Sequence, residues 1–162
     1  MLKLYRITNG RKEYWETWDD GKGTHTVHWG KLGTRGNTKT IKSTLRRNAE
    51  TAIQKEIERL TSEGFRPINP EAHITLMIEY TIEGMGTTAD LEKRFRLQDR
   101  MNETLGWTGL GECDGGSTGS GTMEVCTFVV DFQLAKTVIE KDLAGTEFAN
   151  FTRIYDENAT DS

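Results

Sequence analysis

Cysteine and proline are both scarce in this chain. Its 162 residues include two cysteines, Cys113 and Cys126, and two prolines, Pro67 and Pro70. Two cysteines without framework spacing exclude a small disulfide-stapled domain, so we expect both to be free thiols. No apolar run reaches the ~20 residues that a membrane-spanning helix needs, and residues 1–12 contain no stretch typical of a signal peptide. These absences predict a cytoplasmic protein without membrane contact.

Groups suited to catalysis or metal binding are also few. The three histidines are His25, His28 and His73, and neither they nor the cysteines show zinc-site spacing. His25 and His28 are three residues apart in a strand-like run, so their side chains should face opposite sides of a sheet. No Ser-His-Asp, Cys-His or paired-carboxylate pattern is evident in the local order. We therefore expect no catalytic residue, no metal and no cofactor, and hence a non-enzymatic protein.

The charge is divided unevenly along the chain. Residues 1–70 hold 14 Lys and Arg against 8 Asp and Glu, a net charge of +6. Residues 71–162 hold 7 against 17, a net charge of −10, which agrees with the overall charge of −4. A basic half followed by an acidic half indicates two modules with different partners. We expect the basic half to contact nucleic acid, either DNA or RNA.

The first half alternates between strand-like runs and turn signals. In chain order, the runs cover residues 2–8, 12–18, 24–29 and 38–42. Asn9-Gly10 between the first two runs is a strong hairpin signal. Over residues 46–63 the apolar spacing changes to three and four, as in an amphipathic helix that Gly64 would end. The start of this helix can be capped by Asn48, Ser43 or Thr44. The pattern predicts an antiparallel sheet with one helix packed on it.

The densest cluster of chemical signals is the twelve-residue segment 28–39. It contains a large aromatic, three cations and three glycines, in the order His28-Trp29-Gly30-Lys31-Leu32-Gly33-Thr34-Arg35-Gly36-Asn37-Thr38-Lys39. Glycines at this density exclude a helix and let backbone approach a ligand closely. Cations beside a flat aromatic face suit a phosphate-bearing ligand with a sugar or a base.

Within this segment, Trp29-Gly30-Lys31-Leu32-Gly33-Thr34 resembles the signature of the WGR domain, known from DNA-dependent poly(ADP-ribose) polymerases and from bacterial proteins. The resemblance covers residues 1–66. It implies that the signature Trp lies against the nucleic-acid backbone and that the cation in the third position assists. Here that position is Lys31, which keeps the charge of arginine but loses its bidentate fork. The candidate nucleic-acid-binding residues are Trp29, Gly30, Lys31, Arg35, Lys39, Lys42, Arg46 and Arg47.

Arg46 and Arg47 can be interpreted in two ways. If they begin the predicted helix, they oppose its dipole, and an external anion would then explain their presence. Alternatively, they precede the first helical turn.

The second half predicts another mixed domain. The expected elements are a strand at 74–83, a helix that begins within 87–90 and runs to about 105, a strand at 123–130, a helix after Asp131 and a strand at 148–155. The first helix is expected to bury Leu91, Phe95, Leu97 and Met101. Cys126 should be buried in its strand, and Cys113 exposed in a loop. If the glycine-rich stretch 109–121 includes a strand, the order is β-α-β-β-α-β, a ferredoxin-like layout.

These patterns predict an α+β protein of two domains. The expected division is a WGR-like domain at 1–66, a linker at 67–72, a ferredoxin-like domain at 73–156 and a polar tail at 157–162. The predicted function is binding of DNA backbone or DNA ends, coupled to a second domain that binds a protein partner or forms a homodimer. The alternative is a ligand-responsive regulator or adaptor whose acidic second domain binds a small molecule or a protein.

Two glycine-rich segments bear on that alternative. Gly84-Met85-Gly86-Thr87-Thr88-Ala89 fits the local dinucleotide pattern between a strand and a helix, although a plain strand-to-helix turn also explains it. Residues 109–121 are either a bulged hairpin or a binding loop.

Overall fold

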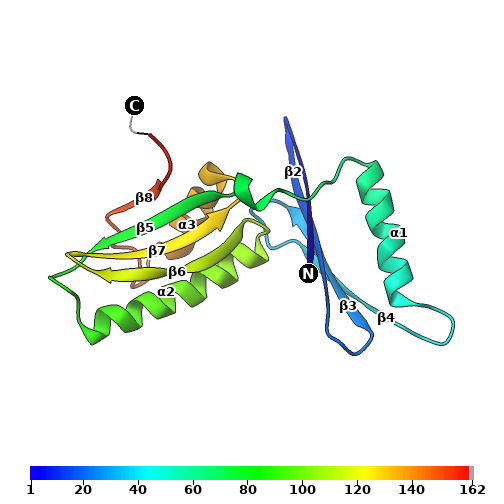
Figure 1. Ribbon diagram of the computed structural model, residues 1–162, viewed down its shortest axis with the longest axis horizontal. Helices are drawn as coiled ribbons and strands as arrows, with labels where there is room; N and C mark the ends of the chain where they lie inside the picture. The colour runs from blue at the N-terminus through cyan, green and yellow to red at the C-terminus, as the bar shows by residue number, and fades with distance from the viewer. Residues whose placement is uncertain (161–162) are drawn as a thin grey trace. The chain divides into compact units, whose positions relative to one another are not determined.

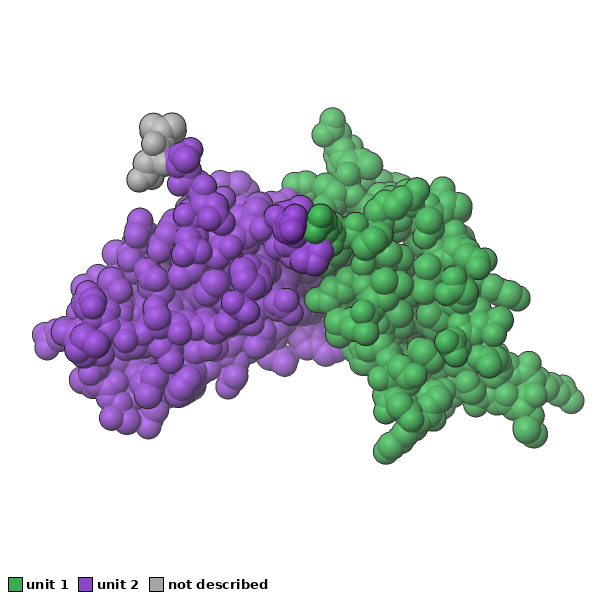
Figure 2. All heavy atoms as spheres, viewed as in Figure 1, with its two compact units in different colours: residues 1–69 green, residues 70–162 purple. Residues whose placement is uncertain are grey.

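The computed structural model describes residues 1–160 of the chain. The chain divides into two compact units, Met1–Asn69 and Pro70–Ser162 (Figure 2). We call them unit 1 and unit 2 and describe each by itself.

Unit 1 is an antiparallel meander with one helix along it (Figure 1). Its elements are β1 (Leu2–Thr8), β2 (Arg11–Asp19), β3 (Thr24–Lys31), β4 (Asn37–Lys42) and α1 (Ala49–Ser62). Each strand pairs with the next along the chain, so β1 and β4 are the edges of the sheet. The backbone of Tyr5 in β1 exchanges two hydrogen bonds with that of Arg66, both 2.8 Å, so the outer side of β1 is partly covered. The predicted meander is confirmed.

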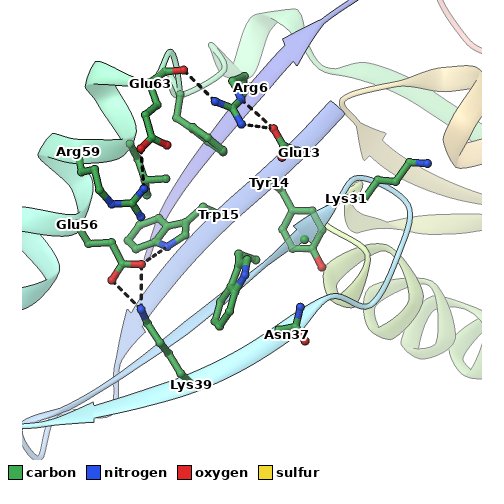
Figure 3. Close-up of a pocket in the computed structure, with 14 residues that line it drawn as sticks. Arg6, Glu13, Tyr14, Trp15, Lys31, Asn37, Lys39, Glu56, Arg59 and Glu63 are labelled. Carbon is green, nitrogen blue, oxygen red and sulfur yellow. Dashed lines mark hydrogen bonds and ion pairs between the residues drawn. The ribbon is translucent and has the colours of Figure 1, made fainter. Parts of the chain in front are cut away.

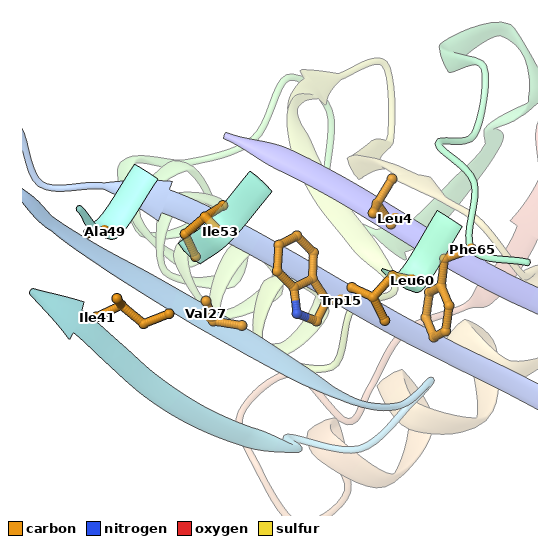
Figure 4. Close-up of a cluster of buried hydrophobic side chains, with 8 residues drawn as sticks. All are labelled: Leu4, Trp15, Val27, Ile41, Ala49, Ile53, Leu60 and Phe65. Carbon is orange, nitrogen blue, oxygen red and sulfur yellow. The ribbon is translucent and has the colours of Figure 1, made fainter. Parts of the chain in front are cut away.

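One apolar core fixes α1 to the sheet (Figure 4). Its buried members are Leu4, Trp15, Val27, Ile41, Ala49, Ile53, Leu60 and Phe65. Each strand contributes one of them from the face toward α1, as expected from the alternation of side chains in a strand. Fully burying a side chain of this size contributes ~1.5–3 kcal/mol. Trp29 packs against the core at its edge and is only partly buried.

The helix begins later than the sequence pattern predicts. α1 starts at Ala49, and the Asn48 side chain accepts a hydrogen bond from the backbone N–H of Thr51 at 3.2 Å. Arg46 and Arg47 lie before the first helical turn, so the argument from the helix dipole does not apply to them. The hydroxyl of Ser43 accepts from the N–H of Ala49 at 3.0 Å, so two of the three proposed capping side chains act at this helix start.

Unit 2 follows the predicted order of elements. They are a 3-10 helix at Pro70–Ala72, then β5 (Ile74–Thr81), α2 (Thr88–Trp107), β6 (Gly111–Gly119), β7 (Thr122–Val129), α3 (Phe132–Leu143) and β8 (Arg153–Asp156). The strand order is β6-β7-β5-β8, and every pair is antiparallel. This β-α-β-β-α-β sequence is the ferredoxin-like arrangement. The last strand is shorter than predicted, because Phe148 is buried before it and its carbonyl accepts from the Tyr80 hydroxyl at 2.8 Å.

The two helices of unit 2 are joined by polar contacts. The guanidinium of Arg100 in α2 donates to the carboxylate of Asp142 in α3 at 2.8 Å, and the Thr104 hydroxyl donates to the same carboxylate at 3.0 Å. α2 and α3 therefore pack side by side against the sheet (Figure 1).

The predicted burial of four apolar residues of α2 is correct for only two of them. Leu97 and Met101 are fully buried as predicted, but Leu91 is 38% and Phe95 51% exposed. At 3.6 residues per turn, Phe95 lies about 160° and Leu91 about 120° around the helix axis from Leu97. Apolar residue type suggested four core positions, but only two of them face the sheet.

The glycine-rich stretch 109–121 contains β6 and its hairpin turn with β7, with a bulge between Cys113 and Gly115. Cys113 therefore lies in a strand and not in an exposed loop. Cys126 is only partly buried, because it alternates along β7 with the fully buried Val125 and Thr127. Both cysteine placements differ from the sequence prediction. Burial raises the pKa of both thiols.

The segment 84–89 is a capped strand-to-helix turn. The Thr87 side chain accepts from the N–H of Asp90, and the Asp90 carboxylate accepts from the N–H of Thr87 at 2.8 Å. A carboxylate thus occupies this helix start, where a bound phosphate would have to lie. With an antiparallel sheet beside it, the dinucleotide interpretation finds no support.

The two faces of α2 should respond differently to substitution. We expect Leu97→Ala to lower the free energy of unfolding by ~2–5 kcal/mol, because it opens a cavity in the core. Phe95→Ser should change it by less than ~1 kcal/mol, because the ring is half exposed. Urea unfolding of the two full-length variants, followed by circular dichroism, measures both values. A Phe95→Ser loss as large as that of Leu97→Ala would contradict this placement of α2.

Candidate functional site

The segment after β3 forms a tight loop, residues 32–36, which we call the signature loop. Leu32 is buried and its N–H donates to the carbonyl of Lys12 at 2.8 Å, which anchors the start of the loop to β2. The N–H and the hydroxyl of Thr34 both donate to the carbonyl of Lys31, at 3.0 and 2.7 Å. The loop is therefore a closed turn whose backbone is held at its first half.

The second half of the signature loop folds back onto β3 through two glycines. Gly36 has a φ of +62°, and a Cβ there would lie 2.1 Å from the carbonyl oxygen of Trp29 and 2.5 Å from the Tyr14 hydroxyl. A Cβ on Gly30 would lie 2.7 Å from the Cα of Gly36. Only residues without side chains allow this close approach.

A buried polar network fastens the signature loop to the sheet. The Tyr14 hydroxyl donates to the carbonyl of Thr34 at 2.8 Å, and His28 Nε2 lies 2.6 Å from the carbonyl of Arg35. On the other side of the ring, His28 Nδ1 lies 2.7 Å from the Glu16 carboxylate. His28 is 1% exposed. Burial, and to a smaller extent the Glu16 charge, raises the pKa of Tyr14, which keeps its hydroxyl protonated as a donor.

His28 is the centre of this network. Its Nε2 lies 2.6 Å from the carbonyl of Arg35 and 3.0 Å from the Tyr14 hydroxyl, and its Nδ1 lies 2.7 Å from the Glu16 carboxylate. Removing one partner of a buried hydrogen bond leaves the other unsatisfied, which is destabilising.

On the opposite face of the sheet, a groove of about 540 Å³ opens between the strands and α1 (Figure 3). Four of the predicted residues line it, namely Trp29, Gly30, Lys31 and Lys39. It is also lined by charged and polar residues that sequence reasoning missed, namely Arg6, Glu13, Asn37, Glu56, Arg59 and Glu63.

Three of the four cations in this groove are paired with glutamates. Arg6 lies 2.6 Å from Glu13, Lys39 lies 2.9 Å from Glu56, and Arg59 lies 2.8 Å from Glu63. Only the Arg59–Glu63 pair, at i,i+4 in the helix, carries a local sequence signal. The other two join residues that become neighbours only in the folded unit. Lys31 extends away from these pairs (Figure 3), and among residues 1–160 no carboxylate lies within ion-pair distance of it.

Trp29 lies beside a set of contacts that join the sheet to α1 through Glu56. The Lys39 ammonium is 5.4 Å from the centroid of the Trp29 ring, a cation–π contact. The same ammonium donates to Glu56, which also accepts from the Trp15 indole N–H at 3.1 Å. Lys39 is therefore engaged in positioning the indole, and Trp29 is partly core and partly groove wall.

The remaining predicted residues lie outside the groove. Arg35 is in the signature loop, where its carbonyl is held by His28 while its side chain is exposed. Lys42 ends β4, and Arg46 and Arg47 belong to the turn before α1. All four side chains are exposed. Four of the eight predicted binding residues therefore line the groove, and the other four lie at the two ends of β4.

A comparison with known protein families now bears on unit 1. The family model of the WGR domain matches residues 1–72. This part of the chain carries a WGR domain. The WGR domain is a nucleic-acid-binding module and is not catalytic by itself. No curated protein and no solved structure gives a significant match to the chain.

The WGR signature can now be understood in physical terms. Gly30 of the signature allows the close contact with Gly36. Trp29 packs against the edge of the core beside the groove, and Lys31, in the third position, points outward. Within residues 1–160, no group of three His, Cys, Asp or Glu side chains could hold a metal ion. None of the helices in the same range is both long and apolar enough to span a membrane.

The glycine contact gives a direct test of the loop geometry. We expect Gly36→Ala to destabilise the WGR domain by more than the ~1–2 kcal/mol that a left-handed backbone costs an alanine, because the new Cβ collides with the carbonyl of Trp29. Gly10→Ala is the matched control, since Gly10 has a φ of +88° but a Cβ there would meet no heavy atom within 4 Å. Thermal unfolding of both variants gives the difference. Equal losses would contradict the close packing of Gly36.

Proposed function

We propose that the WGR domain binds the sugar–phosphate backbone of DNA through the signature loop and Trp29. The observation that carries this proposal is the fixed loop itself. Its backbone is anchored by Tyr14 and His28, while the Lys31 and Arg35 side chains are exposed beside a partly exposed indole. Because the backbone that carries these two cations is already fixed, only their side chains must become ordered when a phosphate binds.

The charge pairing favours Lys31 and Arg35 as the phosphate contacts. Neither side chain has a carboxylate partner among residues 1–160, so a phosphate can approach without breaking an existing ion pair. Arg6, Lys39 and Arg59 would each have to leave a glutamate first. We therefore assign the paired cations Arg6, Lys39 and Arg59 a positioning role, and Lys31 and Arg35 the contact with the backbone.

Trp29 is proposed to supply the uncharged part of the contact. Lys39 lies over its ring, so a sugar or a terminal base would pack against the part of the indole that faces the groove. A flat aromatic surface of this kind accepts any base or sugar, so binding should depend little on sequence. Lys31 attracts phosphate as a point charge, without the bidentate geometry of arginine.

Unit 2 is proposed to have a separate task, because its net charge of −10 would repel a phosphate backbone. We propose that it contacts a protein partner or a second copy, so that the whole chain is a non-enzymatic adaptor. The alternative role as a small-molecule sensor is favoured by one observation, a groove of about 400 Å³ lined by Phe132, Lys136, Arg153, Ile154, Tyr155, Asp156, Glu157 and Ala159. A ligand-induced rise in the unfolding temperature that Lys136→Ser abolishes would support the sensor.

Replacing the two loop cations should change the salt dependence of binding. For Lys31→Ser/Arg35→Ser on duplex DNA, we expect the log–log salt slope to become less steep by about 1.8, since each phosphate contact contributes about 0.9. Fluorescence anisotropy in a series of salt concentrations measures it. Arg11→Ser/Lys55→Ser is the matched control, because it removes two exposed charges that line no part of the groove. Equal changes in both variants would show that only net charge matters.

Removal of the indole should act differently from removal of a charge. We expect Trp29→Ala to weaken binding by ~1–3 kcal/mol, the usual value of an aromatic stack, with an unchanged salt slope. The measurement belongs at a temperature where circular dichroism shows the variant folded, because Trp29 also contributes to the core. Unchanged affinity in the folded variant would mean that the indole does not touch the ligand.

A further inference from the structure

Exposed cations without partners gather at both ends of β4. Lys31 and Arg35 lie just before the strand, and Lys42, Arg46 and Arg47 lie at its end and in the following turn. Among residues 1–160 none of these five side chains has a carboxylate within ion-pair distance. In the groove, by contrast, the cations are mostly neutralised by glutamates. The charge available to a phosphate therefore lies along β4.

The turn after β4, which we call the tip, consists of residues 44–47 and is held rigidly. Thr44 and Arg47 exchange two backbone hydrogen bonds, at 2.8 and 3.2 Å. The preceding residue, Ser43, donates its N–H to the carbonyl of Gly23 at 3.1 Å, and its hydroxyl accepts from Ala49. The tip presents the fully exposed side chain of Leu45, followed by the two arginines.

Among residues 1–160, the acidic residues near the tip form no ion pair with its cations. In the neighbouring turn between β2 and β3, the Asp20 carboxylate accepts from the backbone N–H groups of Lys22 and Thr24, and Asp19 accepts from that of Gly21. Glu50 lies in the first turn of α1. None of these carboxylates forms an ion pair with Lys42, Arg46 or Arg47.

The outer edge of β4 connects the two groups of cations. β4 is the last strand of its sheet, and all of its residues except Ile41 are exposed. Its six residues span roughly 20 Å at the usual rise of a strand. Each strand of a DNA duplex carries one phosphate per ~3.4 Å of helix axis, so this distance corresponds to about six base pairs.

We propose that the outer edge of β4 is a track for one duplex, which contacts the signature loop at one end and the tip at the other. This inference rests on the proposed function and deepens it, because it gives the ligand a minimum length. A duplex shorter than about six base pairs reaches only the loop cations. A longer one also reaches Lys42, Arg46 and Arg47, and then gains the additional phosphate contacts.

The test is the dependence of affinity on duplex length. DNA stems of 4, 6, 8, 10 and 12 base pairs, each closed by an uncharged ethylene-glycol linker, are titrated with the full chain by fluorescence anisotropy. We expect the affinity of the unmodified chain to rise stepwise near six base pairs. Arg46→Ser/Arg47→Ser should lose most of this step, because it keeps only Lys42 of the three cations at that end of β4. Both arginines are exposed, and thermal unfolding checks that the variant is folded.

Salt dependence provides the second readout. On the 12-base-pair stem, the tip variant should have a log–log salt slope less steep by about 1.8 than the unmodified chain, and on the 4-base-pair stem an unchanged slope. Between 50 and 200 mM salt, the unmodified chain should therefore lose about twelvefold more affinity for the long stem than the tip variant does. Arg11→Ser/Lys55→Ser, with the same change in net charge, should keep the step.

The outcomes separate this proposal from the proposed function. If the loop variant Lys31→Ser/Arg35→Ser loses binding but the tip variant keeps the length step, the track is wrong and binding through the loop stands. If the tip variant and the Arg11→Ser/Lys55→Ser control lose the step equally, the effect is one of net charge and the track is also wrong. If the unmodified chain binds no stem of any length, both proposals fail.

Discussion

The contact on which the WGR domain depends is the buried arrangement of Tyr14, His28 and Glu16. Two neighbouring strands supply these side chains, and they bond to the carbonyls of Thr34 and Arg35 in the signature loop. These bonds satisfy the two loop carbonyls, so the three side chains and the loop conformation stabilise each other. Because the network lies on the sheet face opposite α1, the apolar core and the loop anchor are built from alternate residues of the same strands.

The ion pairs divide the cations of the basic half into two groups, those paired with a glutamate and those without a carboxylate partner. In the groove, glutamates neutralise Arg6, Lys39 and Arg59, and the Lys39–Glu56 pair joins β4 to α1. The cations at the ends of β4 have no such partners among residues 1–160. Net charge alone does not distinguish the two groups. A phosphate that binds an unpaired cation breaks no ion pair, whereas one that binds a paired cation must first displace a glutamate.

Local patterns predicted the fold class and the order of elements, because alternation, helical spacing and turn residues act over a few positions. Local patterns gave wrong predictions where contacts with a distant element determine which residues are buried. Leu91 and Phe95 have the residue types of a core, but the sheet of unit 2 packs against the other side of α2. Arg46 and Arg47 continue a helical spacing, but Asn48 caps the helix after them. At the candidate site, the sequence indicated Trp29 and Lys31, whereas Glu13 and Glu56 reach the groove only through tertiary contacts.

The contact between Gly30 and Gly36 has a consequence for how such a module can diversify. Both glycines are fixed by packing within the domain, since any side chain there meets backbone or the Tyr14 hydroxyl. The residues between them that point outward, Lys31 and Arg35, carry no part of that packing. Exchanges at these two positions therefore leave the packing between the glycines unchanged. The segment 28–39 thus combines a glycine contact that tolerates no side chain with two outward side chains that can change without disturbing it.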